Sequence, residues 1–91
     1  MKSKGTIQDA IDRWGVQMQT VVCMEECAEL IKECSKMLRG KGDKEHLIEE
    51  MADVYICLEM LKKMYGISST DIVNERVRKL ERLRKRIEED K

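Results

Sequence analysis

The sequence lacks proline and phenylalanine altogether, and its 91 residues are rich in Glu, Lys, Leu, Ile and Met. A composition of this kind favours helices. The sequence also lacks an excess of charge of either sign, because 18 basic side chains balance 18 acidic ones. Proteins that bind nucleic acid or membrane surfaces through electrostatics usually have a basic excess. The balanced charge therefore argues against both of those functions.

Long apolar runs are absent as well. No apolar segment approaches the roughly 18 residues that span a bilayer. The N-terminal residues are polar and do not form the hydrophobic core of a secretory signal. We therefore expect a cytoplasmic protein in which the four cysteines are reduced thiols. The length predicts one small domain, residues 1–91, with a modest core that oligomerisation would help to stabilise.

The periodicity of the apolar residues predicts four helices and no strand. The expected bounds are residues 7–14, 16–39, 44–65 and 69–89. Thr6 is the expected N-cap of the first helix, and Gly15 either interrupts or only weakens the helical pattern after it. Asp43 and Ser68 are expected to cap the third and fourth helices, and Gly66 to end the third. Short connections between long helices favour antiparallel neighbours, so the predicted fold class is an all-α, four-helix bundle.

Two pairs of acidic residues lie within these apolar helices. Glu26 and Glu29 belong to the second predicted helix, and Glu50 and Asp53 belong to the third. Residues three apart lie on the same face of a helix, one turn from each other. None of the four has a basic residue four positions further on. Two antiparallel helices with such pairs would concentrate four negative charges in a small volume, which a hard divalent cation such as Mg²⁺ would neutralise.

The same acids are also compatible with a solvated face, because charge-rich helices often carry clusters of glutamate. The spacing alone leaves these two interpretations open. Other catalytic patterns are missing, since the lone His46 belongs to no Ser-His-Asp or Cys-His arrangement. The segment 40–42, Gly-Lys-Gly, is too short for a phosphate-binding loop. With a cation bound, the acids would suit phosphoryl or nucleotidyl transfer, which depends mostly on positioning and charge stabilisation.

The acidic segments resemble a known motif. Glu25-Glu26-Cys27-Ala28-Glu29, followed by Glu50-Met51-Ala52-Asp53, is similar to the EExxE…ExxD motif of MazG-like nucleoside triphosphate pyrophosphohydrolases, in the all-α NTP pyrophosphatase superfamily. The likeness extends over about residues 10 to 85. It implies a MazG-like chain that forms an oligomeric helical bundle and hydrolyses a nucleotide between its α and β phosphates. The products would be a monophosphate and pyrophosphate, and the cofactor Mg²⁺ or, alternatively, Mn²⁺.

The resemblance also implies roles for individual residues. Four of the implied catalytic acids would be the metal ligands, namely Glu26, Glu29, Glu50 and Asp53. Glu25 would support these ligands or help to activate water. Trp14 and Gln19 would lie on the nucleobase side of the substrate, and Asn74 and Lys79 of the last helix would complete the pocket. The preferred base and sugar are left open.

Two other functions are open alternatives. A phosphoribosyl-ATP pyrophosphatase uses similar acids but typically has a Tyr-His pair soon after the aspartate, whereas Tyr55 is followed here by Ile56. A non-catalytic interaction module would use the same apolar faces to bind a partner helix.

Two apolar stripes complete the expectations. Cysteines 23, 27 and 34 coincide with the apolar seam of the second helix, so we expect core residues rather than a zinc site. The last helix has a stripe that we expect to pack against a second subunit in a homodimer or homotetramer: Val73, Val77, Leu80, Leu83 and Ile87.

Overall fold

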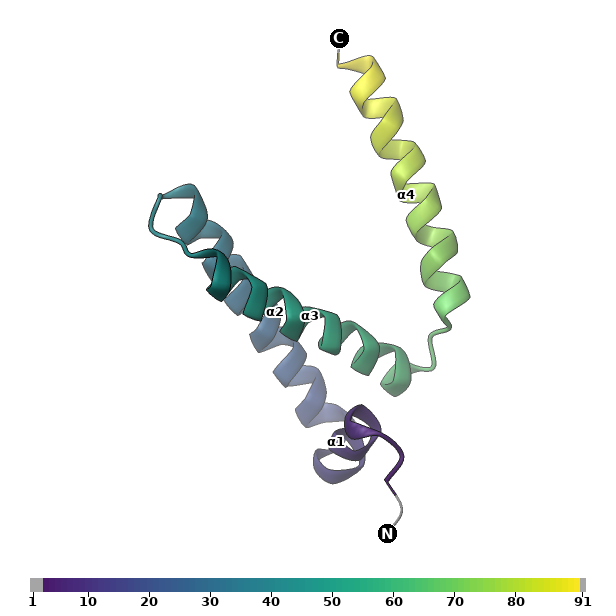
Figure 1. Cartoon of the computed structure of the whole chain (residues 1–91). Coiled ribbons are helices and arrows are strands. Elements are labelled where there is room, and N and C mark those ends of the chain that lie inside the picture. The colour runs from purple at the N-terminus through teal and green to yellow at the C-terminus, as the bar shows by residue number, and fades with distance from the viewer. Residues whose placement is uncertain (1–2, 91) are drawn as a thin grey trace.

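Four α-helices make up the computed structural model of the chain, which describes residues 3–90 (Figure 1). Within that range the secondary structure is entirely helical, without a strand. The helices are α1 Thr6–Trp14, α2 Val16–Leu38, α3 Lys44–Tyr65 and α4 Ser69–Glu89. The all-α prediction is confirmed, and every helix begins and ends within one residue of its predicted bounds.

The start of α1 corrects one sequence-based expectation. Thr6 is the first helical residue, and Gly5 occupies the N-cap position without a side-chain hydrogen bond. The Asp9 carboxylate instead accepts hydrogen bonds from the Ser3 hydroxyl at 2.7 Å and from the backbone N–H of Lys4 at 3.1 Å. The prediction of Thr6 as the N-cap was therefore wrong. The Asp9 carboxylate in the first turn of the helix holds the preceding segment by these two hydrogen bonds.

The caps of the two later helices are confirmed. The Asp43 carboxylate accepts a hydrogen bond from the backbone N–H of Glu45 at 2.7 Å. The Ser68 hydroxyl accepts one from the N–H of Asp71 at 3.0 Å. Each bond satisfies a donor of the first turn that has no partner inside the helix. These caps fix where α3 and α4 begin.

Two glycines set the direction of the chain between helices. Gly15 has φ of 88° and separates α1 from α2, so it interrupts the helical pattern. Gly66 is left-handed, with φ of 63°, and ends α3. Residues with a Cβ rarely adopt either conformation.

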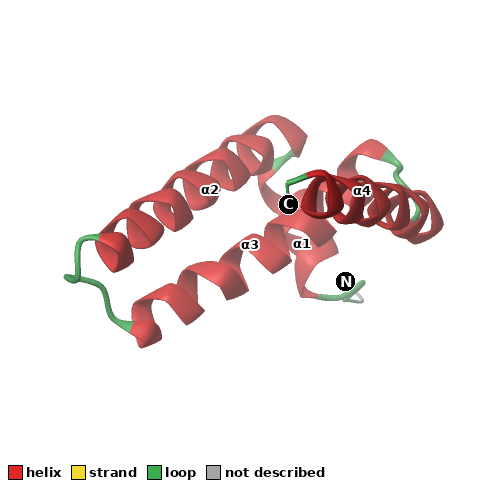
Figure 2. Cartoon of the chain, turned by 90° about the horizontal axis from the view of Figure 1, so that it is seen from above, coloured by secondary structure: helices red, strands yellow, loops and turns green. Residues whose placement is uncertain are grey.

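The core lies where α1, α2 and α3 meet. Figure 2 shows α2 and α3 side by side as a hairpin, with α1 beside the open end of that hairpin. The buried apolar residues are few, and they come from all three helices: Ile11, Cys23, Cys57 and Met60. Helix–helix contacts are most extensive between α2 and α3. This hairpin therefore sets the geometry of whatever lies along it.

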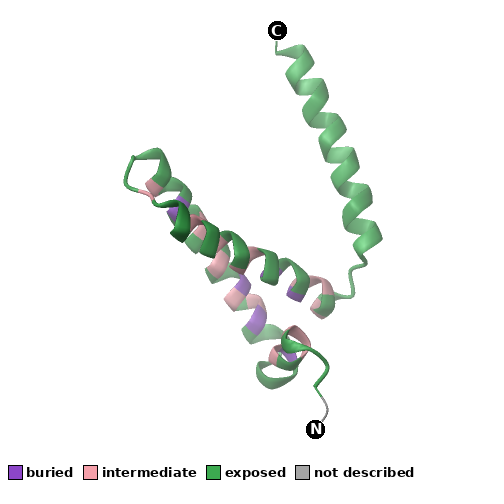
Figure 3. Cartoon of the chain, viewed as in Figure 1, coloured by how far each residue is buried: buried purple, intermediate pink, exposed green. Residues whose placement is uncertain are grey.

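Helix α4 stands apart from the other three. It projects away from the hairpin and buries none of its residues (Figures 1 and 3). The molecule is correspondingly elongated, with extents of 58 × 36 × 19 Å. The predicted stripe on α4 is between 46% and 57% exposed at all five positions. A single chain thus leaves this apolar face uncovered.

The cysteines divide into two environments. Cys23 and Cys57 are buried, and the Cys23 thiol donates a hydrogen bond to the Cys57 carbonyl at 3.7 Å. Burial raises the pKa of the Cys57 thiol to about 12, so it stays protonated and behaves as a small apolar side chain. Cys27 and Cys34 are exposed, which makes the prediction of a core position wrong for them within one chain. The reason is that α3 covers only part of the apolar face of α2.

All four cysteines are free thiols. Among residues 3–90, no helix combines the length and the apolarity that crossing a membrane requires.

The Asp43 cap gives a test of this fold. We expect Asp43→Ala to lower the free energy of unfolding by about 1 kcal/mol, because it leaves first-turn donors of α3 without a partner. Asp43→Asn keeps an acceptor and should stay close to wild type. Urea unfolding followed by circular dichroism measures both. Equal midpoints for Asp43→Ala and wild type would contradict the assigned cap.

Candidate metal centre

Three carboxylates converge where α2 and α3 run alongside each other. Because the helices are antiparallel, the α2 residue Glu26 lies opposite the α3 residues Glu50 and Asp53. Each of the three offers an oxygen atom, and these atoms all lie within 4.8 Å of one another. One turn of helix separates Glu50 from Asp53, so both face α2. The sequence-based expectation of acids from two facing helices is thus realised for three of the four predicted ligands.

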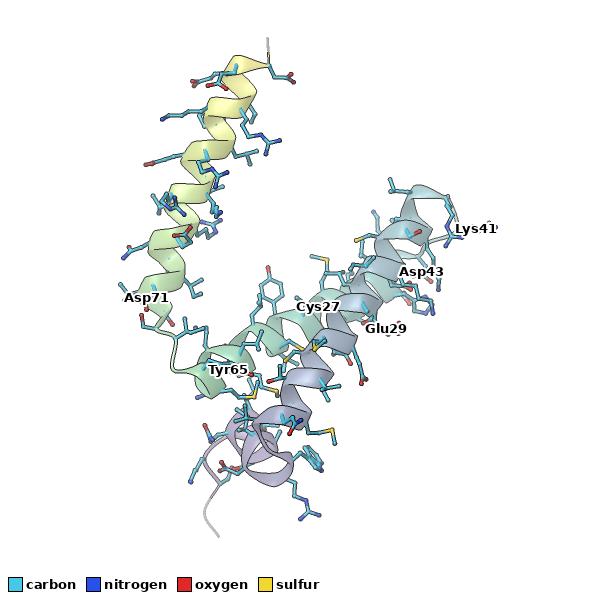
Figure 4. The ribbon with its side chains drawn as sticks, turned by 180° about the vertical axis from the view of Figure 1, so that it is seen from behind. Cys27, Glu29, Lys41, Asp43, Tyr65 and Asp71 are labelled. Atoms are coloured by element: carbon cyan, nitrogen blue, oxygen red, sulfur yellow. The ribbon has the colours of Figure 1, made fainter. Side chains whose placement is uncertain are left out.

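Glu29 lies beside this trio but outside it. It is on the middle turns of α2, and its side chain is exposed (Figure 4). Its negative charge nevertheless contributes to raising the pKa of both Glu26 and Glu50. Glu25 is exposed next to Glu26 and is likewise not part of the trio. For all four predicted ligands to surround one ion, the side chain of Glu29 would have to rotate toward the other three carboxylates.

The trio repels itself. Burial, followed by the charge of Asp53 and a hydrogen bond with it, raises the pKa of the Glu26 carboxyl. Burial, then the charges of Asp53 and Glu29, raises the pKa of Glu50. Burial and neighbouring negative charge both disfavour the ionised form. Without a cation, Glu26 and Glu50 keep their protons to higher pH than free carboxyls do.

One oxygen of the site has no partner. The Oε2 atom of Glu50 is buried, and no hydrogen-bond donor reaches it. A buried polar atom without a partner is unfavourable and uncommon in folded proteins. A cation among the three carboxylates would satisfy this oxygen and offset the repulsion. Oxygen ligands of this number and charge suit Mg²⁺, which binds through a few carboxylates and keeps several waters.

The predicted substrate residues lie further away. Trp14 ends α1 and is 60% exposed, whereas Gln19 on the first turns of α2 is only 6% exposed. Both are at the end of the hairpin next to α1. Asn74 and Lys79 are exposed on α4, which projects away from the hairpin. A single chain therefore does not bring Asn74 and Lys79 to the acids.

The structure adds a residue that sequence reasoning did not assign to the site. Glu33 is only 7% exposed, and its negative charge contributes to raising the pKa of Glu50. Its carboxylate lies 3.2 Å from the ammonium of Lys36. The available signal was helical periodicity, because Glu33 follows Glu26 by two turns and has a lysine three positions further on.

Comparison with known families identifies the chain. The profile of the MazG nucleotide pyrophosphohydrolase domain matches residues 16–87, which include α2, α3 and nearly all of α4. The chain belongs to this family and is therefore a hydrolase of phosphoanhydride bonds that acts on nucleotides. The family is typically metal-dependent, in agreement with the acidic cluster. Neither a curated protein nor a solved structure matches the chain significantly.

The raised pKa of Glu50 gives a test of the site. The folded chain binds the proton of Glu50 more tightly than the unfolded chain does, because folding raises this pKa above its ordinary value of 4.5. The stability that this proton contributes is complete when the pH is below 4.5, and it is lost as the pH rises through the pKa of the folded state. We therefore expect Glu50→Gln to raise the melting temperature at pH 7 in EDTA, and this gain to vanish near pH 4.

The matched control is Glu59→Gln, which changes an exposed glutamate of α3 that does not contribute to the raised pKa of Glu50. It should leave the melting temperature near that of wild type at both pH values. Differential scanning fluorimetry makes the comparison. A Glu50→Gln variant that is less stable than wild type at pH 7 in EDTA would show that no repulsion is relieved.

Proposed function

We propose that this chain hydrolyses nucleoside triphosphates between the α and β phosphates, giving a nucleoside monophosphate and pyrophosphate, with Mg²⁺ or alternatively Mn²⁺. One observation carries the proposal. Oxygens of Glu26, Glu50 and Asp53 lie within 4.8 Å of one another, and one of the buried oxygens has no partner. A cation would relieve the repulsion within such a cluster at neutral pH, and a cation held by carboxylates with open positions is suited to phosphates.

The acids of the hairpin would have two roles, metal binding and proton transfer. Glu26, Glu29, Glu50 and Asp53 would hold the ion. A bound Mg²⁺ would neutralise part of the phosphate charge and lower the pKa of the attacking water. Glu25, exposed one residue before Glu26, accepts the proton of the attacking water. The new bond joins the water oxygen to the α phosphorus, and the bond to the bridging oxygen breaks as pyrophosphate leaves.

A second copy of the chain would complete the pocket. The exposed stripe of α4 resembles the apolar face of a bundle helix that has no partner. Charge favours its docking on a hairpin, because α4 has two more basic than acidic side chains, whereas α2 and α3 together have four more acidic than basic ones. We propose a homodimer or homotetramer in which α4 brings Asn74 and Lys79 to the acids, while Trp14 and Gln19 serve the nucleobase side.

The catalytic proposal is tested by conservative replacement of the ligands. We expect Glu26→Gln and Asp53→Asn to lower the rate of pyrophosphate release by about 100-fold or more, because each removes a charge that holds the ion. A panel of common and damaged nucleoside triphosphates, read by pyrophosphate release, measures the rate and finds the preferred base. Circular dichroism checks that the helices persist. Normal turnover by both variants would refute the ligand assignment.

Two further assays of the same purified protein distinguish the alternative functions. Phosphoribosyl-ATP, tested directly as a substrate, decides the closest enzymatic alternative. A non-catalytic interaction module should melt at the same temperature with and without Mg²⁺ and a non-hydrolysable nucleotide. A ligand at 100 times its Kd stabilises the folded state by about 2.7 kcal/mol. A clear upward shift in melting temperature therefore supports the enzyme.

The oligomer is tested on α4. We expect Leu80→Glu to convert the assembly to a species of 10.7 kDa in light scattering and to lose activity, because a charge in the stripe opposes its burial. Lys85→Glu places the same side chain on the opposite side of α4 and should keep the assembly. A wild-type chain that is monomeric and fully active would show that the pocket needs no second copy.

A further inference from the structure

One edge of α2 changes the sign of its charge. Glu26, Glu29 and Glu33 are followed by Lys36, and about 100° per residue places all four within about 80° of one another on the helix. The change comes in the last turn of α2, where the helix dipole favours a cation. The row that holds the acids of the metal centre thus continues into an ammonium group on the side of the α2–α3 loop.

Lys36 is held in place by a buried partner. The Glu33 carboxylate lies 3.2 Å from the Lys36 ammonium, and the two side chains are 9% and 36% exposed. Glu33 is a buried residue of α2 and follows Glu26 by two turns on the same face of the helix. None of Glu26, Glu29, Glu50 and Asp53 takes part in the ion pairs found among residues 3–90. Lys36 is therefore an anchored cation on the same edge of α2 as the predicted ligands Glu26 and Glu29, and it is paired with neither of them.

The distances suit a polyphosphate chain. Positions 26 and 36 are about 15 Å apart along the helix axis, and the contact with Glu33 turns the Lys36 ammonium back toward the acids. A triphosphate tail together with the flexible lysine side chain extends over a span of that size. A lysine ammonium binds phosphate oxygens as a compact point charge with three donors. The Lys36 ammonium has three donors, so it is able to contact a phosphate oxygen while it keeps the Glu33 carboxylate as a partner.

We propose that Lys36 binds the β and γ phosphates of the substrate and that Glu33 is a positioning residue that holds the ammonium ready. This inference rests on the proposed function and orients the substrate within it. The α phosphate lies at Glu26 and Asp53, the tail points toward the loop after α2, and the nucleoside points toward the α1 end of the hairpin. The substrate class is then a nucleotide with two phosphates beyond the α phosphate.

The test measures binding of inorganic pyrophosphate in the presence of Mg²⁺ by calorimetry, together with KM and kcat for a triphosphate. We expect Lys36→Met to weaken pyrophosphate binding about tenfold and to raise KM about tenfold, with kcat changed less than about twofold, because the lost contact is made in the ground state as well as in the transition state. Lys36→Arg should restore most of the affinity.

Two further variants separate this role from a structural one. Lys63→Met removes a lysine in the last turn of α3, at the opposite end of the hairpin from Lys36, and should match wild type in both measurements. Glu33→Gln should raise KM while leaving kcat near wild type, since it releases the ammonium without removing it. A Glu33→Gln variant that lowers kcat and leaves KM unchanged would refute the positioning role.

The possible failures are distinguishable. Wild-type affinity for pyrophosphate and wild-type KM in Lys36→Met would overturn the proposal, as would a wild-type chain that binds no pyrophosphate. A chain that hydrolyses no triphosphate but binds pyrophosphate in a Lys36-dependent way would refute the proposed function and leave the phosphate site standing.

Discussion

Antiparallel packing of α2 against α3 determines both the core and the candidate site. Cys23 and Cys57, which form much of the buried contact, lie one turn from Glu26 and Asp53 respectively. The apolar seam and the acidic row are therefore adjacent edges of the same two helices. Any shift in helix register that disturbed the seam would also separate the carboxylates. A small chain with few buried side chains thereby obtains a defined site from a single helix–helix contact.

That contact holds together groups that repel each other. Burial and mutual charge raise the pKa of Glu26 and of Glu50, so the folded chain at neutral pH carries an unfavourable cluster along its main interface. The buried thiols and Met60 next to it supply apolar contact without further charge. Stability and function are opposed at this place, as is common for active sites. A bound cation reverses the balance, because the same carboxylates then become ligands.

Local signals and helical periodicity account for most of what the sequence predicts correctly. The caps at Asp43 and Ser68 depend on residues within three positions, and the approach of the acids of α2 to those of α3 follows from period and antiparallel direction. Burial was harder to predict, because it depends on which helix covers which face. Cys27 and Cys34 fall on the seam by periodicity yet are exposed, since α3 covers only part of the apolar face of α2. Glu33 shows the converse, a buried charged residue that periodicity places on the same face as Glu26 but whose burial depends on the packing of α3 against that face.

An acidic site that acts on an anion has to gather positive charge from several sources. Four carboxylates and a triphosphate together carry more negative charge than one divalent ion offsets. Within the hairpin, the anchored ammonium of Lys36 supplies part of the difference. Helix α4 adds seven basic side chains against five acidic ones, so its excess charge is opposite to that of the hairpin, and its apolar stripe is uncovered. In the proposed assembly, the same electrostatic deficit would favour both a metal at the acids and a second copy of the chain, so that assembly and substrate binding would depend on one balance of charge.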